Sequence, residues 1–167
     1  EYISLNANGI QSIPYDIIAI YRSLKFANTI LILGVSGCIL LPFVRFFGSS
    51  KIIVNIDGLE WKRDKWGKFA KIFLKFSERI AVNFSNIIIT DNKAIQDYVE
   101  KKYSVKSHLV AYGSDNVYKG EVLDLSNNYE FLTSDFAFKV CRVEPENNLH
   151  LILKVFSSFT SYPLVIV

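Results

Sequence analysis

Short apolar segments alternate with longer amphipathic segments along the chain. The short segments are rich in β-branched residues and predict strands at residues 2–5, 30–33, 51–55, 86–90, 108–111, 136–141 and 164–167. Several are apolar throughout, which is expected of strands covered on both faces. The amphipathic segments predict helices at residues 14–25, 38–47, 65–84, 93–102 and 148–159. Such repeated strand–helix units predict an α/β protein with a doubly wound parallel sheet, whose ligands bind at the carboxyl ends of the strands.

A polar segment at residues 112–129 interrupts this alternation and is typical of a linker, because it contains Gly113, Gly120 and two adjacent asparagines. We place a domain boundary within it, so that residues 1–118 form a first lobe and residues 119–167 begin a second. The chain has no Met and ends inside an apolar run. We therefore expect a fragment that lacks the start of the first lobe and most of the second. Its exposed terminal strand could pair with a second copy and form a dimer.

Composition narrows the class of protein. A hydrophobic content of 50% and 13 Phe indicate a folded globule, and a net charge of +3 is too small to imply a nucleic-acid partner. Cys38 and Cys141 are predicted to be buried free thiols, and no Cys/His cluster has the spacing of metal ligands. Glycines, a proline and an arginine interrupt the apolar stretch 29–47, which therefore predicts a strand, a turn and a short helix rather than a membrane span.

The predicted helix 65–84 has the clearest periodicity, with Asp64 as its expected N-cap. Its apolar residues recur at three- and four-residue spacing and predict one broad buried face: Trp66, Phe69, Ile72, Phe73, Phe76, Ile80 and Phe84. Its basic residues lie on another face: Lys65, Lys68, Lys71, Lys75 and Arg79. This basic stripe is either a solvated face or a surface for an anionic membrane or a phosphate-rich substrate.

The segment 55–63, reading NIDGLEWKR, follows a predicted strand and should lie at the ligand edge of the sheet. It collects charged and turn-forming residues with one aromatic ring: Asn55, Asp57, Gly58, Glu60, Trp61, Lys62 and Arg63. An indole of this kind packs against a sugar ring or an apolar ligand. The alternative is a salt-bridged turn that stabilises the entry of the next helix.

A second candidate follows the predicted strand 136–141, where Arg142 precedes Pro145, Asn147 and a helix start. A guanidinium beside helix-start amides suits a diphosphate, although many α/β proteins carry a surface arginine there. Glu144 would repel phosphate unless it points elsewhere, for example to sugar hydroxyls.

Three further turns carry weaker signals. Asp91 and Asn92 are expected to form a helix N-cap at the ligand edge, and the glycine turn 34–37 is too short for a dinucleotide fingerprint. The polar loop 6–12 (NANGIQS), which contains Asn8, either contacts substrate or is turn chemistry centred on Gly9.

Together, NIDGLEWKR, ITDNKAIQDYV, AYGSD and CRVEPENN resemble bacterial family 4-type glycosyltransferases, and most closely the rhamnosyltransferase-like group of polysaccharide assembly. The resemblance covers nearly the whole chain. It implies two Rossmann-like lobes in the GT-B arrangement and a retaining, metal-independent hexosyltransferase without a cofactor. The implied donor is a nucleotide sugar, dTDP-rhamnose, and the implied acceptor is a lipid-linked glycan of capsule-type polysaccharide.

The resemblance also implies roles for single residues. Asp57 and Glu60 would be catalytic, and the acceptor side would comprise Asn8, Asn55, Gly58, Trp61, Lys62 and Arg63. The donor side would comprise Gly113, Asp115, Arg142, Glu144 and Asn147, with Arg142 on the diphosphate. The expected location is cytoplasmic, and the basic stripe leaves open a peripheral contact with the inner face of the plasma membrane.

The chain departs from the family pattern at two positions, because Asn147 stands where the family has Lys and Cys141 where it has Gly. The family's glycine-rich loop and its paired glutamates are not in this chain, so we expect it to be inactive by itself. Two rival interpretations stay open, a non-catalytic α/β binding or scaffold domain and a membrane-surface module.

Overall fold

A computed structural model describes residues 2–7, 9–113, 115, 128–158 and 162–167. The chain forms two compact units, Glu1–Gly113 and Ser114–Val167. The expected boundary between residues 118 and 119 lies outside the described residues.

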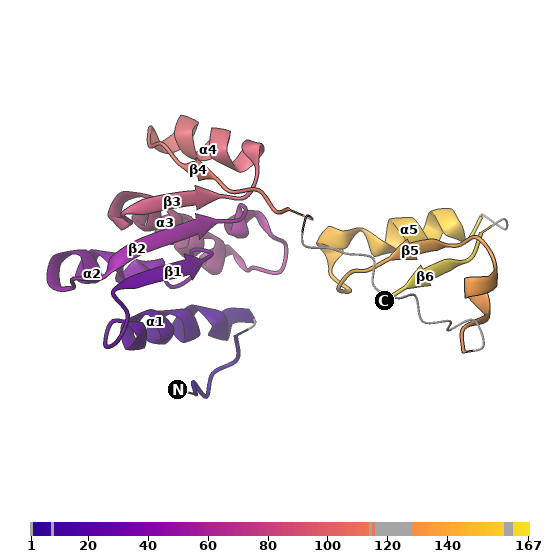
Figure 1. The fold of residues 1–167 in the computed structure, drawn as a ribbon, viewed down its shortest axis with the longest axis horizontal. Helices are drawn as coiled ribbons and strands as arrows, with labels where there is room; N and C mark the ends of the chain where they lie inside the picture. The colour runs from indigo at the N-terminus through magenta and orange to yellow at the C-terminus, as the bar shows by residue number, and fades with distance from the viewer. Residues whose placement is uncertain (1, 8, 114, 116–127, 159–161) are drawn as a thin grey trace. The chain divides into compact units, whose positions relative to one another are not determined.

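The first unit is built on a parallel sheet of four strands: β1 (Thr29–Leu33), β2 (Lys51–Ile56), β3 (Ile87–Thr90) and β4 (His108–Leu109). The strands lie side by side in the order β1-β2-β3-β4 (Figure 1). This arrangement confirms the predicted Rossmann-like α/β class. The strand predicted at residues 2–5 is wrong. The Tyr2 carbonyl there accepts a hydrogen bond from the Arg22 guanidinium at 2.9 Å, which ties the segment to a helix instead of to the sheet.

The helices of the first unit are α1 (Ser12–Ser23), α2 (Leu41–Phe47), α3 (Lys68–Phe84) and α4 (Lys93–Tyr103). Short 3-10 turns lie at η1 (Gly9–Gln11), η2 (Cys38–Leu40) and η3 (Glu60–Lys62). The apolar stretch 29–47 is divided into β1, a turn, η2 and α2, as predicted. No helix in the described part of the chain is long and apolar enough to cross a membrane.

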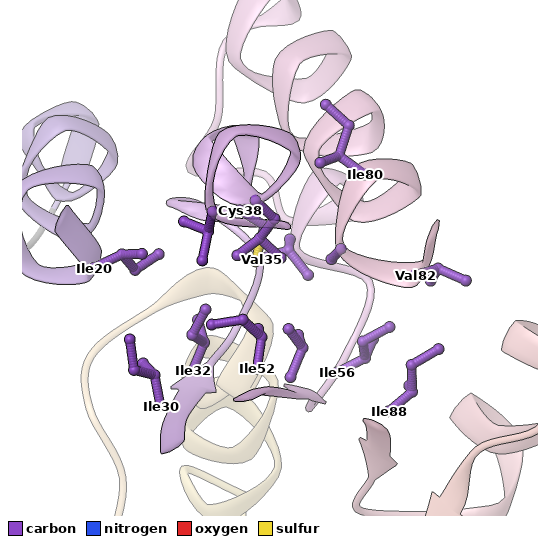
Figure 2. Close-up of a cluster of buried hydrophobic side chains, with 14 of the residues drawn as sticks. Ile20, Ile30, Ile32, Val35, Cys38, Ile52, Ile56, Ile80, Val82 and Ile88 are labelled. Atoms are coloured by element: carbon purple, nitrogen blue, oxygen red, sulfur yellow. The ribbon is translucent and has the colours of Figure 1, made fainter. Parts of the chain in front are cut away.

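One face of the sheet forms the core of the unit. Alternate residues of the strands point to this face, among them Ile30, Ile32, Ile52, Ile56 and Ile88, and pack under η2 and α3 (Figure 2). The other face of β1 differs from the sequence-based expectation of two covered faces, because Leu31 and Leu33 are 56% and 72% exposed. Right-handed crossovers between strands in sequential order place their connecting helices on a single face, which accounts for the difference.

Helix α3 departs from its prediction in two ways. It begins at Lys68, because residues 60–67 form a separate turn, and Asp64 pairs with Lys71 at 3.7 Å instead of capping the helix. Its predicted buried face is also wrong in part. Trp66 and Ile80 are buried, whereas Phe69, Ile72 and Phe76 are exposed: 91%, 68% and 55% respectively.

The beginning of α4 confirms its predicted cap. The Asn92 side-chain oxygen accepts a hydrogen bond from the Ile95 amide at 2.9 Å, which satisfies one of the unpaired amides of the first turn.

The second unit contains η4 (Glu130–Thr133), β5 (Ala137–Lys139), η5 (Pro145–Asn147), α5 (Leu149–Phe156) and β6 (Leu164–Ile166). Strands β5 and β6 pair in parallel, so the predicted strand–helix–strand unit is present. Cys38 of the first unit is buried and Cys141 of the second is half-buried, and both are free thiols.

Candidate functional site

The carboxyl ends of β1 and β2 open onto a cavity of about 280 Å³ in the first unit. Segments that are distant in sequence bring polar side chains to it: α1, the turn after β1, and residues 57–66 after β2. Its polar lining includes three carboxylates, two cations and two hydroxyls: Asp16, Asp57, Glu60, Arg63, Lys65, Ser12 and Ser36. The cavity therefore lies at the edge where a parallel sheet is expected to bind ligands.

The glycine turn after β1 allows α1 to approach this edge. Gly34 has φ +94°, a left-handed conformation that glycine adopts without steric cost. A Cβ on Gly37 would lie 2.8 Å from the Asp16 backbone and from the Ile20 side chain, so only glycine fits against α1 there. Ser36 then donates a hydrogen bond to the Asp16 carboxylate, which holds this acid at the cavity.

Glu60 binds the side chains of its own turn. Its Oε1 accepts a hydrogen bond from the Trp66 indole at 3.0 Å and pairs with the Lys65 ammonium at 3.1 Å. Its Oε2 pairs with the Arg63 guanidinium at 3.2 Å. Burial favours a higher pKa for Glu60, but these donors outweigh burial and lower its pKa. Glu60 is therefore held as an anion, and the salt-bridged turn is present.

Asp57 has the opposite electrostatic character. Desolvation is the main cause that raises the pKa of its carboxyl, and the charges of Glu60 and Asp91 raise it further. A backbone hydrogen bond and the charge of Arg63 act in the other direction. Two neighbouring carboxyls with pKa values shifted apart are typical of acid–base sites.

Asp16 is a third acid at the cavity. Desolvation raises the pKa of its carboxyl, and the hydrogen bond from Ser36 opposes part of that rise. The cavity thus combines one firmly ionised carboxylate with two carboxyls that hold their protons more strongly than in water. An ionised carboxylate accepts hydrogen bonds from the hydroxyls of a ligand, and a protonated carboxyl can donate one to them.

A buried acid supports the turn from the other side. Glu78 of α3 is fully buried, and its Oε1 accepts hydrogen bonds from Tyr98 at 2.7 Å, Lys102 at 3.0 Å and Tyr103 at 2.5 Å. Its Oε2 accepts the Trp61 indole N–H at 3.0 Å. Burial and the contact with Glu78 raise the pKa of Tyr103 well above its usual range. Glu78 therefore fastens η3 to α3 and α4.

The indole of Trp61 is also surrounded by cations. The ammonium groups of Lys75, Lys102 and Lys62 lie 4.9, 5.4 and 5.5 Å from its ring centre, within the range of cation–π attraction. The Trp61 indole, which was predicted to lie on the acceptor side, is thus held by side chains of α3 and α4.

The structure brings together only some of the predicted site residues. Asp57, Glu60 and Arg63 line the cavity, whereas Gly58, Trp61 and Lys62 belong to the same turn but do not line it. The Asn55 side-chain oxygen is buried and makes no hydrogen bond with the described residues. Asn8 lies outside those residues, although its neighbours Ala7 and Gly9 line the cavity. The roles of all of these residues stay predictions.

The predicted donor-side residues lie mainly in the second unit. The Arg142 side chain is 74% exposed and pairs with Glu144 at 3.4 Å, so this acid faces the guanidinium. Asn147 donates a hydrogen bond from its side chain to the Arg142 carbonyl at 2.7 Å, which closes the turn before α5. Gly113 ends the first unit, and both Gly113 and Asp115 are exposed.

Sequence reasoning missed three residues around this site. Asp16 and Ser36 come from a helix and a turn that only the fold brings together, and Glu78 was one residue among many on a helix. For Glu78 a signal was present, since it is the single acid in an otherwise basic and apolar helix.

Comparison with known families matches residues 4–115 to a family model described as "Domain of unknown function (DUF1972)". The matched segment contains the four-stranded sheet and the cavity residues. A search of curated proteins gave no match.

Proposed function

This chain belongs to the DUF1972 family, whose description assigns no activity, and we propose that it acts as a glycosyltransferase whose first unit forms the acceptor side. The proposed enzyme is a retaining, metal-independent hexosyltransferase of polysaccharide biosynthesis. It transfers rhamnose from dTDP-rhamnose to a lipid-linked glycan. The observation that carries the proposal is the pair of carboxyls at the cavity, Asp57 with a raised pKa and Glu60 with a lowered one.

The cavity chemistry supports a sugar as ligand. Carboxylates and cations that converge on a small space make the directional hydrogen bonds that sugar hydroxyls require. A volume of about 280 Å³ is slightly below the range of ligand pockets, roughly 300 to 1,000 Å³, so the cavity suits a single sugar ring.

Asp57 is the residue that we place at the reacting hydroxyl. In the transfer, the acceptor oxygen forms a bond to the anomeric carbon, and the diphosphate leaves with the electron pair of the broken bond. The hydroxyl proton passes to Asp57 or to the leaving diphosphate. A carboxyl with a raised pKa is suited to hold that proton, whereas Glu60 keeps Arg63 and Lys65 in place.

Arg142 is the residue that we place on the donor diphosphate. Its exposed guanidinium can exchange Glu144 for phosphate oxygens in a forked pair. Calorimetric titration of the full-length protein with dTDP and UDP tests this role. Arg142→Ala should weaken dTDP binding by about tenfold or more, as expected for a charge-assisted contact, while Arg45→Ala on α2 serves as the exposed control.

The transfer step is tested separately by release of dTDP from dTDP-rhamnose, with methyl rhamnoside as the acceptor probe. Asp57→Asn should lower the rate by about a hundredfold or more while dTDP binding stays unchanged. The control is Asp97→Asn on α4, where the exposed carboxylate pairs with Lys93 at 3.0 Å. If neither nucleotide binds and Arg142→Ala changes nothing, the protein is a non-catalytic binding domain instead.

A further inference from the structure

We propose that the outward face of α3 binds membrane surfaces that contain anionic phospholipids. This face comprises six exposed residues: Lys68, Phe69, Ile72, Lys75, Phe76 and Arg79. The proposal goes beyond sugar transfer, since it concerns a different surface of the first unit and a different ligand.

The helical spacing places these six residues on one side of α3. They recur at intervals of one, three and four residues, and the opposite side carries the buried Leu74, Ser77 and Ala81. Phe69 at 91% exposed and Ile72 at 68% are among the most exposed apolar side chains of the chain. A helix that presents large apolar side chains to solvent beside basic ones is typical of binding in a membrane interface.

The charge of this face is entirely positive. The single acid of α3 is Glu78, which points inward and is fully buried. Two cations of the predicted basic stripe are engaged elsewhere, because Lys65 pairs with Glu60 and Lys71 pairs with Asp64. The stripe is thus reduced to Lys68, Lys75 and Arg79, which are interleaved with the apolar residues.

A hollow of about 540 Å³ lies beside this face, between α3 and the end of α4. Lys75, Arg79 and Lys102 line it together with Ile72, Phe76 and Tyr103. Lys102 is paired with Glu78 at 3.0 Å, which leaves Lys75 and Arg79 as the cations for a ligand. Two cations over an apolar floor match a lipid, whose phosphate lies directly above its hydrocarbon chains. A nucleic acid would use the cations and give Ile72 no partner, so the combined chemistry favours lipid.

Co-flotation with vesicles tests the proposal on the full-length protein. The vesicles are phosphatidylcholine alone and an equimolar mixture with phosphatidylglycerol. The chain offers a matched set of variants, because an exposed Lys-Phe pair occurs at residues 68–69, 75–76 and 25–26. Each pair is changed to Glu-Ala, and the pair Lys25 and Phe26, in the turn after α1, is the control.

The wild type should float with the mixed vesicles, more weakly at high salt, and should not float with phosphatidylcholine alone. Each α3 variant should bind at least about tenfold more weakly, because one basic residue near an anionic surface contributes roughly fivefold and the reversal removes more. The control variant should bind like the wild type. Equal binding to both vesicle types, no binding, or an equal loss in the control would each overturn the proposal. None of these readouts depends on sugar transfer.

Discussion

Replacement of Glu78 by Gln should destabilise the first unit by about 3 kcal/mol. The Glu78 carboxylate is fully buried and accepts four hydrogen bonds, from Trp61, Tyr98, Lys102 and Tyr103. Gln keeps the shape but offers one acceptor oxygen and one NH2 group, which only donates hydrogen bonds. If its oxygen replaces Oε1, its amide faces the Trp61 N–H, so that two donors meet.

The magnitude follows from these contacts. Loss of the Trp61 hydrogen bond to a charged group costs about 1.5–3 kcal/mol. The Lys102 ammonium loses its carboxylate as well. Breaking a buried ion pair costs about 3–5 kcal/mol, and we take the lower end. The reason is that the Lys102 side chain is 30% exposed, so water can replace part of the lost interaction.

The assay is urea unfolding followed by tryptophan fluorescence. Both tryptophans, Trp61 and Trp66, belong to the first unit, so the signal reports on that unit. Glu100→Gln, at a half-buried position on α4, is the control and should change the free energy of unfolding by less than about 0.5 kcal/mol. The double variant with Tyr103→Phe should cost less than the sum of the single changes. A Glu78→Gln protein as stable as the control would refute the reasoning.

Two further predictions concern the edge of the cavity. Gly37→Ala should destabilise the unit by about 1–3 kcal/mol in urea unfolding, because the new methyl group would lie 2.8 Å from Asp16 and Ile20. Gly113→Ala, which meets open space, is its control, and equal losses would count against the close approach of α1. Asp57→Asn should stabilise the unit at neutral pH, because desolvation raises the pKa of the carboxyl and disfavours its ionised form. The wild type should regain this stability as the pH falls through the folded-state pKa, so a difference that is constant with pH would contradict the assignment.

Apart from the strand at residues 2–5, the order of strands and helices could be predicted from the sequence, because each β-branched run and each amphipathic run carries its own signal. The position of Asp57 and Glu60 after β2 followed from the same reasoning, since the carboxyl end of a parallel strand is a defined place in the fold. The N-cap at Asn92 was also local and is confirmed.

The remaining features depend on contacts between distant segments. Asp16 is held at the cavity because Ser36, twenty positions away, donates a hydrogen bond to its carboxylate from the glycine turn. In α3, apolar residues occupy two opposite sides, and periodicity alone does not decide which side the sheet covers. The sequence therefore indicated an amphipathic helix but assigned Phe69, Ile72 and Phe76 to the core. In the structure the other side of α3 packs on the sheet, and these three side chains are exposed.

The turn η3 carries adjacent side chains into two separate networks. Glu60 forms ion pairs with Arg63 and Lys65 and a hydrogen bond with Trp66 at the cavity. Its neighbour Trp61 forms a hydrogen bond with the buried Glu78 of α3. Neither residue can be repositioned alone, because a shift of the turn would break contacts on both sides. The turn, α3 and α4 therefore form one module and would have to be exchanged together in a chimera. Grafting the turn alone would separate Trp61 from Glu78 and from the side chains of α4 that bind Glu78.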